Sequence, residues 1–112
     1  MKISLPVIVS AFALVALPSA LSAADAKTNW TQSCAKCHGA DGAGQTKVGK
    51  KLGIKDYTSA DAQAKLTDDD MLKAITNGVK DDAGKDKMQA FKDKISDQEA
   101  KDLVAFIRTL KK

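Results

Sequence analysis

The chain contains few of the residues that many small proteins use for catalysis or cross-linking. Its 112 residues include two cysteines, two prolines and one histidine. Two cysteines cannot supply the multiple disulfides of a small secreted scaffold, and with one histidine they fall one ligand short of a structural zinc site. A single histidine leaves no second imidazole for acid–base chemistry, and no carboxylate pair is identifiable beside it. The sequence therefore gives no sign of an enzyme.

Arginine is also scarce, since Arg108 is the only one, and the basic charge comes from lysines interleaved with aspartates. Nucleic-acid binding requires a basic stripe, which this pattern does not make. Two lysine clusters stand out, Lys47, Lys50, Lys51 and Lys55, and later Lys85, Lys87, Lys92 and Lys94. Most of these side chains are expected to be solvated, and the second cluster would orient an acidic partner if it borders a functional edge.

The first two dozen residues differ from the rest. Lys2 is their only charge, Val7–Leu17 is an apolar run, Pro18 breaks it, and the small residues Ser22-Ala23-Ala24 follow. This order is typical of a secretory signal peptide, so we predict a signal over residues 1–24, cut after Ala24, with Ala26 as the second choice. The alternative is a retained membrane anchor, although Pro18 interrupts the run that would have to span the ~30 Å hydrocarbon core. We expect a periplasmic protein without a membrane span in its mature form.

Cleavage leaves a domain over residues 25–112, which is 112 − 24 = 88 residues. Loss of Lys2 lowers the formal charge from +4 to about +3. A domain of this size is only marginally stable unaided. Both prolines, Pro6 and Pro18, lie in the signal, and tryptophan, tyrosine and phenylalanine are few. A core filled partly by a cofactor would agree with this composition.

The most specific motif is Cys34-Ala35-Lys36-Cys37-His38. Two thiols spaced i and i+3 lie on one face of a helical turn, and the imidazole follows directly. The pattern C-x-x-C-H is the attachment site of a c-type haem. Each thiol adds to one porphyrin vinyl group, and the histidine is then held as an axial ligand of the iron. The motif predicts one covalently bound haem c, attached through Cys34 and Cys37 and ligated by His38.

Three other interpretations of the same residues remain open at this point. A thioredoxin-like dithiol would need a βαβ pattern near the C-x-x-C, which is not visible. A zinc site would lack its fourth ligand. A structural disulfide between Cys34 and Cys37 would leave His38 without a role.

The periodicity predicts an all-α protein. Helices are expected over residues 25–36, 67–77 and 96–110, with a further short one over 59–66. A Gly- and Lys-rich loop over 39–57 is expected to be a flexible wrap anchored inward by Leu52 and Ile54. The segment 79–87 is polar and turn-like.

The stretch from Trp30 to Leu110 resembles the class I c-type cytochromes. The residues that carry the resemblance are Trp30, Cys34, Cys37, His38, Gly39, Ile75-Thr76-Asn77-Gly78, Met88-Gln89-Ala90-Phe91 and 103–110. The resemblance implies a small helical fold whose first and last helices cross near Ala26, Trp30 and Phe106. It also implies that Met88 is the second axial ligand.

The residues agree with that choice of methionine. Met88 stands in an otherwise polar loop, where an apolar thioether has no packing reason, whereas Met71 lies on an apolar helical stripe. Tyr57 fits either a haem propionate contact or a simple surface or core role. Family members often have a proline after the ligand methionine, where this chain has Gln89. The usual proline of the 39–57 loop is missing too, so the acceptor for the Nδ1–H of His38 is expected to be another backbone carbonyl, near Leu52.

The expected function is that of a soluble, monomeric, single-haem electron carrier between larger redox proteins, through small transient contacts. A haem enzyme or gas sensor with an open iron position is the main alternative, and it requires Met88 to dissociate. A dedicated subunit of one dehydrogenase complex is a third.

Overall fold

The computed structural model describes residues 2, 10–13 and 23–112. The predicted signal peptide over residues 1–24 lies mostly outside the described residues. In chain order the elements are α1 (Ala23–Asn29), the π-helix η1 (Trp30–Cys34), α2 (Ala35–His38), α3 (Lys47–Leu52), α4 (Ala60–Ala64), α5 (Asp68–Asn77), β1 (Val79–Lys80), β2 (Asp86–Met88) and α6 (Asp97–Thr109). The predicted helical fold is confirmed, with one small antiparallel sheet added to it.

The first helix runs through α1, η1 and α2 and contains one wide turn. The backbone N–H of Ala35 donates to the carbonyl of Trp30, which is the i→i+5 bond of a π-helix. Gly39 ends the helix with a φ of 86°, a conformation that favours glycine. The predicted range of 25–36 lies within this helix and missed the wide turn and two residues at each end.

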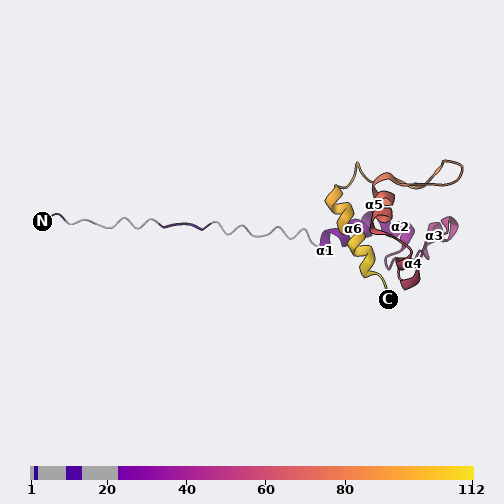
Figure 1. Cartoon of the computed structure of the whole chain (residues 1–112), viewed down its shortest axis with the longest axis horizontal. Helices are drawn as coiled ribbons and strands as arrows, with labels where there is room; N and C mark the ends of the chain where they lie inside the picture. The colour runs from indigo at the N-terminus through magenta and orange to yellow at the C-terminus, as the bar shows by residue number, and fades with distance from the viewer. Residues whose placement is uncertain (1, 3–9, 14–22) are drawn as a thin grey trace.

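The first and last helices cross, as the resemblance implied (Figure 1). Ala26 is buried at this crossing, and the rings of Trp30 and Phe106 lie 5.6 Å apart between centroids. The side-chain amide of Asn29 donates to a carboxylate oxygen of Glu99 at 2.9 Å. The same carboxylate completes the capping box with Ser96 that begins α6.

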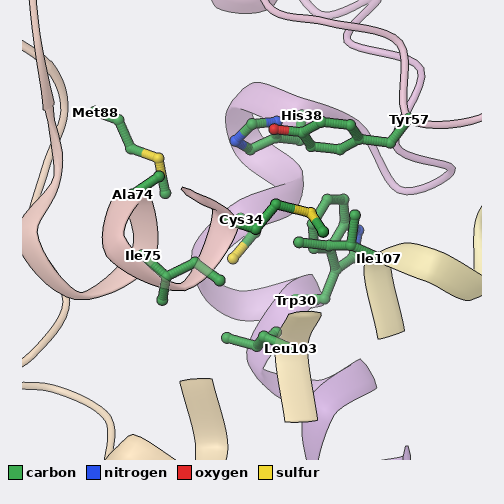
Figure 2. A pocket seen from close by; sticks show the side chains of 10 residues that line it. Trp30, Cys34, His38, Tyr57, Ala74, Ile75, Met88, Leu103 and Ile107 are labelled. Carbon is green, nitrogen blue, oxygen red and sulfur yellow. The ribbon is translucent and has the colours of Figure 1, made fainter. Parts of the chain in front are cut away.

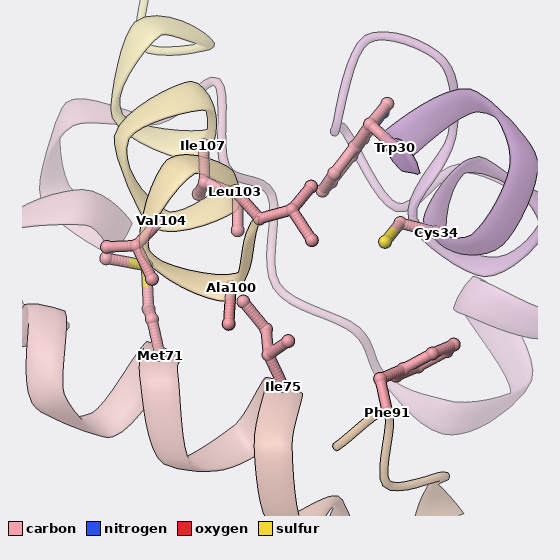
Figure 3. Close-up of a cluster of buried hydrophobic side chains, with 9 residues drawn as sticks. All are labelled: Trp30, Cys34, Met71, Ile75, Phe91, Ala100, Leu103, Val104 and Ile107. Carbon is pink, nitrogen blue, oxygen red and sulfur yellow. The ribbon is translucent and has the colours of Figure 1, made fainter. Parts of the chain in front are cut away.

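The core lies where α5 and α6 meet the first helix (Figure 3). Thr67 caps α5 through its side chain, and the acidic residues of the first turn suit the positive end of the helix dipole. The buried apolar cluster consists of Trp30, Cys34, Met71, Ile75, Phe91, Ala100, Leu103, Val104 and Ile107.

Two features were not expected from the sequence. The 39–57 loop contains the helix α3, capped by the Thr46 side chain and ended by Gly53 at a φ of 66°. The second is in the segment after α5, which was predicted only as a polar turn: β1 and β2 form an antiparallel hairpin there that projects from the body (Figure 1). The predicted turn character of residues 79–87 is correct between the strands, where Gly84 has a φ of 80°.

The other loop predictions are close to the structure. The expected short helix over 59–66 is α4, begun by Ser59. Leu52 and Ile54 are half-buried, which agrees with inward anchors. Among residues 2, 10–13 and 23–112, no helix combines the length and the apolar character needed to cross a bilayer.

Candidate functional site

A cavity opens between the attachment motif, α5 and α6. It encloses about 370 Å³, counting the part open to solvent, and is lined by Trp30, Cys34, His38, Tyr57, Met71, Ala74, Ile75, Met88, Leu103 and Ile107. Most of these side chains are apolar, and the polar groups among them are an imidazole, a phenol and an indole N–H.

Figure 2 shows how three of the predicted site residues reach this cavity. Cys34 comes from the wide turn, His38 from the last position of α2, and Met88 from the end of β2. Cys37 lies half-buried one turn after Cys34, and is not among the lining residues.

The two cysteines are free thiols in the structure. Burial raises the pKa of Cys34 to about 11, and the neighbouring Cys37 adds to the shift. A reactive dithiol needs the opposite, a pKa lowered toward neutrality. The only sheet in the described residues is a two-stranded antiparallel hairpin, so a thioredoxin-like site is not supported.

Two aromatic rings pack against His38. The Tyr57 ring stacks on it with centroids 5.3 Å apart and 21° between planes, and the Trp30 ring lies 5.6 Å away at 39°. Burial lowers the pKa of the imidazole, which favours the neutral form that binds metals. The Nδ1 atom is buried and has no hydrogen-bond partner among the described residues. The expected backbone acceptor near Leu52 is therefore not found.

Two methionines face the cavity, and they differ in their surroundings. Met71 is 4% exposed and belongs to the core cluster on α5, as predicted from its helical stripe. Met88 is half-buried at the end of the hairpin, and its side chain enters the cavity beside Ala74 (Figure 2).

Tyr57 was the residue whose role the sequence left open. Its ring lines the cavity, its carbonyl accepts a hydrogen bond from the Gln63 side chain at 2.8 Å, and burial raises the pKa of its hydroxyl. Sequence reasoning missed Ala74, Ile75, Leu103 and Ile107 as parts of the site. Their apolar spacing predicted a packed helix face, and it carries no signal that separates a face packed on protein from one that lines a cavity.

Comparison with known proteins gives independent evidence on the family of this chain. A family model described as cytochrome C oxidase, cbb3-type, subunit III, matches residues 22–107. Among solved structures, the KustC0563 c-type cytochrome is 34% identical with a TM-score of 0.68, covering 79% of this chain and 99% of that one. A tyrosine-to-phenylalanine mutant of Kustc0563 is 33% identical with a TM-score of 0.65, covering 78% and 99%. A search of curated proteins finds no match.

Fold and cavity together define a small helical haem protein. The chain belongs to the class I c-type cytochromes. Membership implies a haem c with iron and a role in electron transfer.

The residues of this chain fit that group. Thiol, thioether and imidazole donors face one apolar cavity, and burial lowers the pKa of the His38 imidazole, which favours its neutral, metal-binding form. Within the part of the chain that the structure describes, no three His, Cys, Asp or Glu side chains gather to hold a bare metal ion. The donor set therefore suits a metal that brings its own macrocycle, and a zinc site is not supported.

Proposed function

We propose that this protein is a single-haem electron carrier in which Cys34 and Cys37 hold the haem through thioethers and His38 and Met88 are the axial ligands. The observation that carries the proposal is the apolar cavity reached by Cys34, His38 and Met88 from three different elements. The bound haem supplies an iron that takes up and releases one electron. A thioether paired with an imidazole favours the reduced iron and raises its potential.

The residues of the chain serve this role by excluding water and fixing donors. Ile75, Leu103 and Ile107 close the cavity with apolar surface from two packed helices. Burial lowers the pKa of the His38 imidazole, which favours the neutral form that binds metals. No second imidazole exists in the chain to move protons for substrate chemistry.

Export completes the proposal. The apolar run and small residues of segment 1–24 support cleavage of a signal peptide and export to the periplasm. The lysines of both clusters are exposed, so we expect redox partners with acidic surfaces and association that slows as salt rises.

The first experiment is the mass and the visible spectrum of the exported protein. The expected mass is that of the processed polypeptide plus one haem. Replacing Cys34 and Cys37 together by alanine should let acidified acetone extract the haem, which it cannot do from the wild type. A colourless protein, or a mass equal to the bare processed polypeptide, would overturn the proposal.

The same sample distinguishes a carrier from a sensor or haem enzyme. With Met88 bound, the ferric protein should show a sulfur–iron charge-transfer band, and the ferrous spectrum should not change on adding carbon monoxide. A high-spin spectrum that responds readily to carbon monoxide contradicts methionine ligation and favours an open iron position.

A second candidate comes from the matching family description, which names a subunit of an oxidase. As a dedicated subunit, this chain would co-purify with a large partner from its own cells in a fixed ratio. A mobile carrier would be recovered alone at moderate salt.

A further inference from the structure

The C-terminal end of α2 is bound by three separate hydrogen-bond donors. The carbonyl of Cys37 accepts from the hydroxyl of Thr46 at 2.6 Å. The carbonyl of His38 accepts from the backbone N–H of Gly44 at 2.7 Å. The carbonyl of Gly39 accepts from the indole N–H of Trp30 at 3.1 Å. We call these three bonds the carbonyl clamp.

Such carbonyls usually have no partner inside their own helix. Here two of them are bound by donors from the loop that follows the helix, Gly44 and Thr46, and the third by the indole of Trp30, earlier in the same helix. Trp30 is a rigid donor because it is 2% exposed and its ring contacts both His38 and Phe106. The clamp therefore joins the end of the attachment helix to the crossing of the first and last helices.

Thr46 is equally constrained. Its hydroxyl donates to Cys37 and also accepts from the N–H of Gly49 at 2.8 Å, as the cap of α3. A Cβ atom on Gly49 would lie 2.7 Å from the Cys37 carbonyl oxygen, so the loop backbone lies directly against the attachment helix. This close approach explains a glycine inside a helix, where it is otherwise unfavourable.

The ring of His38 has no comparable support. Its Nδ1 atom has no partner among the described residues, and the region from residue 25 onward contains no proline. The position of the imidazole must then be set through its backbone and through the Trp30 and Tyr57 rings that pack against it.

We propose that Trp30 and Thr46 are positioning residues for His38, which they hold in place through the backbone carbonyls on either side of it. The inference rests on His38 being an axial ligand, as proposed above. In many metal sites the histidine is oriented by a hydrogen bond that its other, non-ligating ring N–H donates. In this chain, two side chains that never touch the iron fix the orientation.

The test compares four variants of the haem-loaded protein. Thr46→Val removes the hydroxyl and keeps the shape, and Thr46→Ser restores it. Trp30→Phe keeps an aromatic ring and removes the N–H. Thr76→Val is the matched control, because Thr76 is also half-buried and donates to a helix carbonyl, that of Leu72, at 2.9 Å.

Two readouts report on the clamp without depending on electron-transfer rates. The hyperfine-shifted ring protons of the axial histidine in the ferric NMR spectrum report its orientation. Hydrogen exchange at the Gly44 amide reports the bond to the His38 carbonyl. Thr46→Val should move the histidine resonances and speed exchange at Gly44 by about three- to tenfold, the equivalent of one hydrogen bond. Trp30→Phe should move the histidine resonances too, while Thr46→Ser and Thr76→Val should leave both readouts near wild type.

Unchanged histidine resonances in both Thr46→Val and Trp30→Phe would overturn the inference while leaving the proposed function intact. Equal shifts in the Thr76→Val control would do the same, because they would reflect general destabilisation. If Trp30→Phe fails to fold, the contrast between Thr46→Val and Thr46→Ser decides alone. Absence of histidine ligation in the wild type would instead remove the proposed function.

Discussion

His38 and Met88 reach the same cavity from two regions that are built differently. His38 ends a helix that crosses α6, and the carbonyls around it are bound by Trp30, Thr46 and a loop amide. Met88 ends a three-residue strand of a hairpin whose other strand residues are exposed. The ladder there has an irregular register between Val79 and Lys80.

The hairpin is fixed at its base. The N–H of Phe91 donates to the carbonyl of Ile75 at 2.9 Å, and Phe91 is buried in the core cluster. Beyond that anchor few apolar contacts hold the strands, and such segments open at low cost. We therefore expect the hairpin that carries Met88 to open locally before the helix end that carries His38 does.

The largest effect should follow from replacing Met88 by leucine, which has a similar volume, and Met71→Leu is the matched control. Met88→Leu should leave haem attached, abolish the sulfur–iron band and allow carbon monoxide to bind. Met71→Leu should keep the band and cost less than about 1.5 kcal/mol of unfolding free energy. An unchanged low-spin spectrum in Met88→Leu would show that another group is the ligand.

A pair of glycines sharpens the comparison at the level of the backbone. A Cβ on Gly78 would lie 2.5 Å from the Met88 carbonyl oxygen, at a φ of +74°. Gly78→Ala should cost about 1–3 kcal/mol and raise carbon monoxide binding, because the strain falls on the Met88 strand. Gly49→Ala crowds the Cys37 carbonyl and should cost a similar amount, about 1–3 kcal/mol, without exposing the iron. If carbon monoxide binding rises equally in Gly78→Ala and Gly49→Ala, the Met88 hairpin is no easier to open than the helix end that carries His38.

Acid should weaken the helix crossing through Glu99. Hydrogen bonds from Asn29 first, and then from Ser96, lower the pKa of this carboxyl below its ordinary value of 4.5. A lowered pKa gives stability that is present above 4.5 and is lost as the pH falls through the folded-state value. The difference in unfolding free energy between wild type and Glu99→Gln should therefore narrow below pH 4.5. If the difference in unfolding free energy between the two proteins stays constant with pH, the ionised Glu99 carboxylate does not stabilise the crossing.

The smallest effect should come from the surface of the hairpin. Lys80 and Asp86 pair at 2.8 Å, with side chains 65% and 68% exposed. Exposed pairs of this kind contribute about 0.2–1 kcal/mol. In urea titrations, Lys80→Ala should lower the free energy of unfolding by no more than that amount. Its visible spectrum without urea should match that of the wild type. A clear loss of the sulfur–iron band would mean that the hairpin ladder itself holds Met88.

Sequence alone placed the elements that carry local signals. Ser96 and Glu99 mark the start of α6, and Thr67 and Gly78 enclose α5. The crossing of first and last helices came from the family resemblance. The helix α3 was missed because its Gly and Lys content resembles a loop, although Thr46 and Gly53 are its caps.

Other features depend on contacts that no local pattern encodes. The hairpin has strands of two and three residues, too short for an alternating pattern to be visible. The carbonyl clamp joins Trp30 to Gly39 and Thr46 to Cys37, nine residues apart in each case. The absence of proline indicated that His38 is supported differently from the family pattern, without indicating which groups replace it.

The wide turn at Trp30–Cys34 has a consequence for how such chains are compared. Each residue of an α-helix rotates the chain by about 100°, and a π-turn inserts one extra residue. Deleting that residue would leave the sequence from Cys34 to His38 unchanged, but the side chains of this motif would then face a different side of the molecule. The number of residues between the α6-facing Ala26 and the first cysteine is therefore as much a part of the signature as the pentapeptide.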